Sequence, residues 1–209
     1  MAQPPPNNPP PPPGPLEALK GWFSKWWNRV RAFCMLAGAW GFLFSVISLL
    51  GFRAGFEYDD GLVYSTPAFQ AAARDGLQPG TPDYWNAVNR GFLFERLKPV
   101  PWLCAWGLKV LGFRVAVFLD RGPEGSDSLE TYWARLADDV YFTPTDNEKY
   151  ELLEKHRFVL YAAASDAGII QARKADVWPL RVLKSGQSVN PLESNPGKYG
   201  ERYLPLSGF

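Results

Sequence analysis

Histidine and cysteine are scarce in this chain. Among 209 residues there is one histidine, His156, and there are two cysteines, Cys34 and Cys104. A zinc site of several histidines is therefore excluded, and the two cysteines predict neither a disulfide nor a catalytic thiol. An excess of charge of one sign is also lacking, since 22 basic residues face 21 acidic ones. This near-neutral balance gives no support for a nucleic acid partner.

The N-terminal quarter differs in composition from the rest of the chain. Residues 1–15, MAQPPPNNPPPPPGP, are rich in proline and predict an extended, polyproline-like tail. Residues 16–32 place aromatic and aliphatic side chains at three- and four-residue steps among basic ones, which predicts an amphipathic helix at a membrane interface. Residues 33–52 carry no charge. Twenty such residues, at about 1.5 Å each, cross a bilayer core of about 30 Å, so we predict a transmembrane helix.

The charges around this span predict its orientation. Basic residues precede it at four positions, namely Lys20, Lys25, Arg29 and Arg31. Only Arg53 follows closely, so the positive-inside rule places the N-terminus in the cytoplasm and residues 54–209 outside. The main rival is a cleavable signal peptide, whose apolar region would be shorter and followed by a small-x-small cleavage site. We predict a single-pass protein of the bacterial inner membrane with a periplasmic C-terminal domain.

Small and aromatic residues mark the parts of this segment from which we expect contacts. Gly38 and Gly41 would let another helix approach closely in lipid. Four tryptophans are expected to contact the membrane or a partner: Trp22, Trp26, Trp27 and Trp40. The expected partners are the membrane and other integral membrane subunits, bound through the tail and the transmembrane helix.

Strands and helices alternate in the remainder of the chain. Strands are predicted at 56–64, 113–119, 140–142, 157–162 and 180–183, with helical segments between them. This order predicts an α/β fold in which a parallel sheet has helices on both faces. Ligands of such sheets lie beyond the carboxyl ends of the strands. The acidic residues Glu57, Asp59 and Asp120 fall there.

Residues 55–69, GFEYDDGLVYSTPAF, and residues 84–89, YWNAVN, resemble the class B acid phosphatases of the haloacid dehalogenase-like superfamily. The similarity covers roughly residues 54–209. It keeps the order of later landmarks, which are the strand at 115–119, a helix with Lys149, Leu160-Tyr161, Ala172-Arg173 and the terminal part over 180–201. The resemblance implies a haloacid dehalogenase-like domain that is periplasmic and hydrolyses phosphate monoesters.

The resemblance also implies a catalytic set. An aspartate acts as the nucleophile, and a second aspartate two residues later acts as acid and base. A hydroxyl group after the second strand and a lysine complete the set. Mg²⁺ is held by the nucleophilic aspartate and by another aspartate late in the chain. The corresponding positions of this chain are Glu57, Asp59, Asp120, Lys149 and Ala164, with Gly61 in place of a threonine. Asp166 follows Ala164 closely. If a metal binds, the implied ligands are Glu57, Asp59 and Asp166.

These departures favour loss of the chemistry. Glu57 is one methylene longer than aspartate, and misplacement by about 1 Å can cost roughly 10²-fold. Asp120 would repel a phosphate dianion. We therefore predict a pseudo-phosphatase without a cofactor, in which Asp59 pairs with Lys149. We predict that it serves as a structural or accessory subunit of an inner-membrane complex, for example a respiratory or photosynthetic one. Two alternatives stay open: a membrane-anchored Mg²⁺-dependent acid phosphatase using Glu57 or Asp59, and an acidic pocket for an uncharged or cationic ligand.

Overall fold

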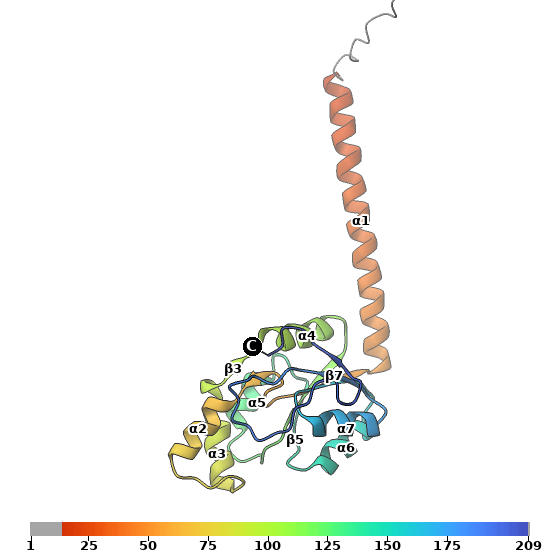
Figure 1. Ribbon diagram of the computed structural model, residues 1–209. Coiled ribbons are helices and arrows are strands. Elements are labelled where there is room, and N and C mark those ends of the chain that lie inside the picture. Colours follow the sequence, from red (N-terminus) through yellow and green to blue (C-terminus); the bar gives the residue numbers. More distant parts are fainter. Residues whose placement is uncertain (1–13, 209) are drawn as a thin grey trace, which may run out of the picture. The chain divides into compact units, whose positions relative to one another are not determined.

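A computed structural model describes residues 14–208 of the chain (Figure 1). The predicted polyproline-like tail over 1–15 therefore lies almost entirely outside the described residues. The chain divides into two compact units within its first helix, and the second unit is Leu43–Phe209.

The first helix, α1 (Pro15–Leu50), covers both segments for which the sequence predicts separate helices. Its 36 residues correspond to about 54 Å at 1.5 Å per residue. The helix is uninterrupted because no proline or glycine occurs between Gly21 and Gly38 to break it. By length and composition, Leu19–Leu50 could cross a membrane, and a signal sequence could meet the same criteria.

The four tryptophans of α1 that are predicted to make contacts are exposed. The side chains of Trp22, Trp26, Trp27 and Trp40 are between 46% and 66% exposed. A Cβ atom built on Gly38 or Gly41 would have no neighbouring atom within 4 Å. Contacts of these residues with lipid and with other membrane subunits stay predictions.

The second unit is built on a six-stranded parallel sheet with the order β5-β4-β1-β6-β7-β8. The strands are β1 (Arg53–Glu57), β4 (Arg114–Leu119), β5 (Asp139–Phe142), β6 (Phe158–Ala163), β7 (Trp178–Arg181) and β8 (Arg202–Tyr203). The predicted parallel α/β fold is confirmed. The short edge strand β8 falls in the part that the sequence analysis leaves without regular structure.

Helices cover both faces of the sheet because the central strands are apolar on both faces. In β4, Val115, Val117 and Leu119 belong to one core, whereas Ala116 and Phe118 belong to the other. The first core is closed by α4 (Pro99–Val110) and α5 (Asp127–Trp133), and the second by α6 (Asp146–Lys155) and α7 (Asp166–Lys174). This two-sided burial explains the unbroken apolar run of β4.

An insert follows the first strand. The antiparallel strands β2 (Val63–Tyr64) and β3 (Arg96–Leu97) enclose α2 (Thr66–Arg74), α3 (Pro82–Arg90) and the 3₁₀ helix η1 (Gly91–Phe94). Helices α2 and α3 pack side by side around a small core of their own (Figure 1). The predicted strand over 56–64 is therefore wrong as one continuous strand, because residues 58–62 form a turn between β1 and β2. The chain turns there because Asp60 has a φ of +56° and three successive N–H groups, those of residues 61–63, donate to the Tyr58 carbonyl oxygen.

Candidate active site

The carboxyl edge of the sheet gathers most of the side chains that the sequence predicts for the site. Glu57 is the last residue of β1, and Asp120 and Ala164 follow β4 and β6 directly. Lys149 reaches this edge from α6, whose start is fixed by a capping box between Thr145 and Glu148. The predicted meeting of these residues at one edge is observed.

Glu57 is completely buried and its carboxylate is saturated with hydrogen bonds. Oε2 accepts from the backbone N–H groups of Ala164 at 2.6 Å and Ser165 at 2.8 Å. Oε1 accepts from Ser165 Oγ at 2.5 Å and from Lys149 Nζ at 3.3 Å. These backbone donors precede α7, where free N–H groups favour an anion. The longer side chain of glutamate thus extends into the beginning of this helix.

Lys149 joins Glu57 to Asp120. Its Nζ lies 2.7 Å from Asp120 Oδ1 and 2.9 Å from Oδ2. Burial opposes its charge, but Tyr161, Glu57 and Asp120 together hold the pKa of Lys149 well above its usual range. Burial, together with the nearby Glu57 charge, raises the pKa of Asp120 to about 7 against the effect of Lys149. With 35% of its side chain exposed, Asp120 is far more accessible than Glu57, at 0%.

Asp59 belongs to a second buried network. Arg121 Nε donates to both carboxylate oxygens of Asp59 at 3.0 Å, and Nη2 donates to the same group and to Glu95 Oε1 at 2.6 Å. The predicted pair between Asp59 and Lys149 is therefore wrong, because a fully buried guanidinium already holds Asp59. Burial and the Asp59 charge raise the pKa of Glu95 to about 7, although Arg121 opposes this. The Tyr58 hydroxyl also donates to Glu95.

Gly61 is explained by the turn in which it lies. A Cβ atom at this position would come within 1.9 Å of the Glu57 carbonyl oxygen, so a side chain has no room. The neighbouring Asp60 is buried, and burial raises the pKa of its carboxyl group. Its Oδ2 accepts a hydrogen bond from Ser188 Oγ at 2.5 Å, whereas its Oδ1 has no partner. This turn ties the end of β1 to the C-terminal segment.

A cleft of about 670 Å³ opens at this edge. Asp59 and Asp120 lie in its lining, together with three aromatic side chains, Phe69, Tyr84 and Trp85. The segment 189–192 forms a further part of the wall. The cleft thus combines two carboxylates with apolar surface, as ligand sites in proteins commonly do.

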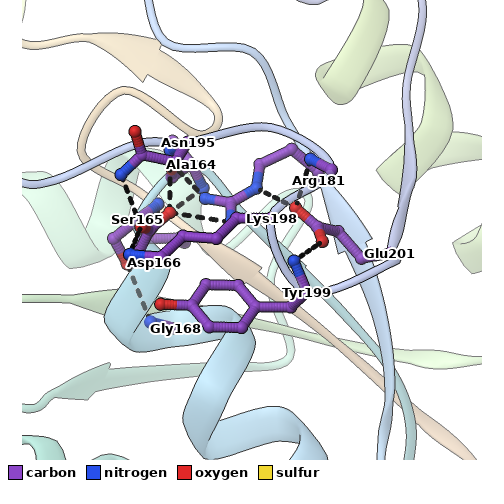
Figure 2. Close-up of polar contacts among 11 residues, drawn as sticks. Ala164, Ser165, Asp166, Gly168, Arg181, Asn195, Lys198, Tyr199 and Glu201 are labelled. Carbon is purple, nitrogen blue, oxygen red and sulfur yellow. Dashed lines mark hydrogen bonds and ion pairs between the residues drawn. The ribbon is translucent and has the colours of Figure 1, made fainter.

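Asp166 lies in a separate arrangement that fixes the C-terminal segment (Figure 2). Its Oδ1 accepts from Arg181 Nη2 at 2.9 Å and from the Asn195 N–H at 2.8 Å, and its Oδ2 accepts from Asn195 Nδ2 at 2.8 Å. Arg181 is fully buried and also donates to Glu201 Oε1 at 2.9 Å and to the Ala164 carbonyl oxygen at 2.9 Å. Burial opposes the shift, but hydrogen bonds from Asn195 and the Arg181 charge lower the pKa of Asp166.

Comparison with known proteins bears on the chemistry of this edge. The chain is 28% identical to a class B acid phosphatase of Edwardsiella ictaluri over 178 residues, which cover 74% of this chain and 71% of the relative. It is 26% identical to a class B acid phosphatase of Marinomonas sp. over 175 residues, covering 76% and 73%. No family model matches the chain.

Solved structures agree on the fold. CbbY from Rhodobacter sphaeroides, solved in complex with phosphate, has a TM-score of 0.52 at 14% identity and covers 75% of this chain and 94% of its own. A haloacid dehalogenase-like hydrolase from Bacteroides fragilis has a TM-score of 0.51 at 12% identity, covering 76% and 98%. The chain therefore has a haloacid dehalogenase-like fold, and its sequence is similar to those of class B acid phosphatases.

These relationships correct two predictions. The prediction that this haloacid dehalogenase-like protein is not an enzyme is wrong, because its relatives are acid phosphatases. The prediction that it takes no cofactor is wrong as well, because haloacid dehalogenase-like hydrolases and class B acid phosphatases depend on Mg²⁺. The departures at Glu57, Gly61 and Asp120 therefore need an explanation other than loss of activity.

The side chains are not arranged to fit Mg²⁺. Within residues 14–208, no three histidine, cysteine, aspartate or glutamate side chains converge on a point where a metal could bind. Mg²⁺ needs oxygen ligands with free lone pairs at about 2.0–2.1 Å. The implied ligands Glu57, Asp59 and Asp166 instead accept hydrogen bonds from three separate sets of donors. No step proposed below is therefore routed through the ion.

Sequence analysis missed three of the residues that shape this haloacid dehalogenase-like site. Arg121 directly follows Asp120 after a buried strand, and that position was a usable signal. Arg181 is the charged last residue of the otherwise apolar strand β7, which is a second signal. Glu95 lies in the insert after η1, and no local pattern marks it.

Proposed function

We propose that this chain is a membrane-anchored phosphohydrolase whose active site is the cleft at the carboxyl edge of the sheet. Its relatives are acid phosphatases, and ligands of such sheets bind at this edge. The observation that carries the proposal is the contact of Asp120, which lines the cleft, with the buried Lys149 behind it, at 2.7 Å. A partly exposed carboxyl group with a pKa of about 7 there lies against a buried cation.

Each residue of this contact has a distinct role in the proposal. Asp120, which is mainly protonated below about pH 7, donates its proton to the leaving-group oxygen as water attacks phosphorus, since a group with a pKa near the working pH transfers protons efficiently. Lys149 neutralises charge on the transferring phosphoryl group. Asp59, held by Arg121, also lines the cleft. Glu57 does not line the cleft, and it holds Lys149 and the start of α7 in place.

The charge of the site favours a phosphate ester at acidic pH. Burial raises the pKa values of Glu95 and Asp120 to about 7, so both carboxyl groups are mainly neutral at about pH 5. The cations Arg121 and Lys149 then face fewer ionised carboxylates than at about pH 9. An anionic substrate is therefore expected to bind better below neutral pH.

Hydrolysis of p-nitrophenyl phosphate by the full chain in detergent tests this proposal, with Mg²⁺ present and with the ion removed by EDTA. We expect faster turnover at about pH 5 than at about pH 8. Asp120→Asn should lower kcat/KM by about 100-fold or more. Asp176→Asn, at an exposed turn beyond the opposite edge, is the control and should keep full turnover. Absence of turnover in the wild-type chain under every condition, or full turnover of Asp120→Asn, would refute the assignment.

We further propose that α1 anchors the domain in the bacterial inner membrane with the N-terminus in the cytoplasm and residues 54–209 in the periplasm. The length and composition of Leu19–Leu50 and the basic residues before the apolar span support this. Association of α1 and the tail with other integral membrane subunits is part of the same proposal. Carbonate extraction tests the anchor, and we expect the chain to stay in the membrane. Protease added to spheroplasts tests the orientation, and we expect it to digest the domain. Protection of the domain from the protease in a chain that resists carbonate would contradict the periplasmic placement and leave the anchor intact.

A further inference from the structure

The amino edge of the sheet begins where α1 ends. Leu50 is the last residue of α1 and Arg53 is the first residue of β1, so only Gly51 and Phe52 lie between them. Three residue steps of at most about 3.6 Å allow a separation of about 11 Å. If α1 spans a bilayer, the amino edge therefore lies at the layer of lipid headgroups.

The joint between α1 and the sheet is packed. Arg157 Nη1 donates to the Leu50 carbonyl oxygen at 3.4 Å, and the rings of Phe52 and Phe113 stack at 6.4 Å between centroids. Gly112 lies so close to the last turns of α1 that a Cβ atom there would be 2.7 Å from the Phe44 carbonyl oxygen. These contacts hold the amino edge against the end of α1.

Basic side chains without acidic partners lie along this edge. Arg114 is the strand neighbour of Arg53, and the Arg157 carbonyl oxygen accepts from the Arg53 N–H at 3.0 Å, so Arg114 and Arg157 flank the first residue of β1. In the part of the chain that the structure describes, no ion pair is formed by Arg114, Lys155 or Arg157, and all three are exposed.

The acidic residues of the edge are mostly neutralised. Asp139 pairs with Arg53 at 2.6 Å, and Asp138 pairs with Lys109 at 3.2 Å. Asp176, in the turn before β7, and Glu154, next to Lys155 at the end of α6, are exposed, form no ion pair within the described residues, and oppose the basic residues in part. The unpaired charge of the edge is therefore predominantly positive.

Apolar side chains accompany these cations. Leu50 is 45% exposed, Val110 at the end of α4 is 51% exposed, and Trp178 at the start of β7 is 53% exposed. A tryptophan and aliphatic side chains beside arginine and lysine form the composition that favours a membrane–water interface. The cleft with Asp120 lies at the opposite, carboxyl edge of the same strands.

We propose that the amino edge of the sheet, formed by Arg114, Lys155, Arg157 and Trp178, binds the headgroups of anionic phospholipids. The domain then lies on the bilayer with the cleft directed toward the aqueous phase. Arginine suits this contact because its guanidinium can donate two hydrogen bonds to one phosphate group. The inference rests on the proposed anchoring by α1, which brings the edge to the lipid surface.

Hydrogen–deuterium exchange of the full chain in nanodiscs tests the inference. Discs of neutral phosphatidylcholine are compared with discs that also contain anionic phosphatidylglycerol. We expect amides of residues 111–114 and 155–158 to exchange at least about threefold more slowly in the anionic discs, because each basic residue near such a surface favours docking about fivefold. Residues 185–195, which border the cleft, should exchange equally in both, and high salt should remove the difference.

Charge reversal supplies the matched variants. Arg114→Glu with Lys155→Glu leaves the contact between Arg157 and Leu50 intact and should abolish the protection in anionic discs. The control, Arg74→Glu with Arg202→Glu, makes the same change of charge at exposed positions outside this edge and should keep the protection from exchange in anionic discs. Turnover in detergent should be unchanged in both double variants, which shows that each is folded.

The outcomes separate the inference from the proposals on which it rests. Equal exchange in the two kinds of disc, with the chain retained in both, would overturn headgroup binding and leave the anchor standing. Release of the chain from membranes by carbonate would overturn the anchor and the inference together. Protection in neutral discs on addition of inorganic phosphate would show a site for free anions and so contradict a lipid surface. Loss of turnover alone would affect only the phosphohydrolase.

Discussion

Replacement of Arg121 by methionine gives the sharpest test of how this site is held together. The Arg121 guanidinium is fully buried, and its side chain donates to Asp59 and Glu95. It also lies 5.0 Å from the ring centroids of Tyr58 and Phe69. Methionine fills much of the volume but leaves two carboxylates without a cation.

The expected cost follows from this burial. Removing one partner of a buried ion pair destabilises a protein by about 3–5 kcal/mol. For a domain of this size, each kcal/mol lowers Tm by about 2–4 °C, so Arg121→Met should lower Tm by about 6–20 °C. The deficit should be larger at about pH 8 than at about pH 5, because the carboxylates left behind can escape the penalty only by taking up protons.

Scanning calorimetry of the full chain in detergent measures this difference without interference from α1 fluorescence. Arg74→Met, on the exposed side of α2, is the control and should stay within about 0.5 kcal/mol of the wild type. Arg121→Met with Asp59→Asn removes both charges and should recover much of the loss. A single variant within about 1 kcal/mol of the wild type at about pH 8, or a double variant no more stable than the single one, would refute the argument.

Three further predictions concern stability. The pKa of Glu95 is about 7 in the folded chain against 4.5 for an ordinary glutamate, so its contribution to the free energy of unfolding is complete below about pH 4.5 and is lost as pH rises through 7. The loss is on the order of 3 kcal/mol. Glu95→Gln should therefore reduce the fall in stability that urea titrations measure between about pH 5 and 8. Gly61→Ala should destabilise the domain by about 2 kcal/mol or more, because a Cβ atom there would clash with the Glu57 carbonyl oxygen. Gly107→Ala is the control and should stabilise α4 slightly, because no atom lies within 4 Å of its Cβ position. Equal effects of the two variants would contradict the close approach of Gly61 to Glu57. Asp166→Ala should lower the free energy of unfolding by about 2 kcal/mol, because it removes the acceptor for Arg181 and Asn195. Amide exchange over residues 193–199 should be faster, both with and without Mg²⁺. An effect seen only with Mg²⁺ would identify Asp166 as a metal ligand instead.

The sheet could be predicted because its central strands carry their own signal. The runs that form β4 and β6 are apolar on both faces, and a parallel sheet buried on both faces requires this. The same kind of sheet predicts that Asp120 lies at the carboxyl edge, close to the end of β1. The prediction of strands failed beyond Glu57, where one strand over 56–64 is predicted but Asp60 and Gly61 form a turn.

The partners of the acidic residues could not be predicted, because they come from elements far away in the sequence. Asp59 is held by Arg121, which is 62 residues later, and Asp166 is held in part by Asn195, which is 29 residues later. Pairing across such separations depends on the tertiary fold, whereas a motif match compares positions one at a time. The interpretation of Glu57 as a misplaced nucleophile arose in this way, since its donors Ala164 and Ser165, directly before α7, leave no mark in the local pattern around Glu57.

One cation connects the insert to the sheet. Glu95 belongs to the insert, Asp59 follows β1 and Arg121 follows β4, so a single guanidinium joins three elements that approach one another only in the folded domain. Tyr84 and Trp85 of the insert line the cleft with Asp59 and Asp120 of the sheet. The position of the aromatic wall relative to the carboxylates is therefore set in part by Arg121, together with Asn89 of α3, whose Nδ2 donates to the carbonyl oxygens of Gly122 and Glu124 at 2.9 Å. Ionisation of Glu95 above pH 7 adds charge to this same junction, which couples the geometry of the cleft to the proton concentration that the proposed chemistry requires.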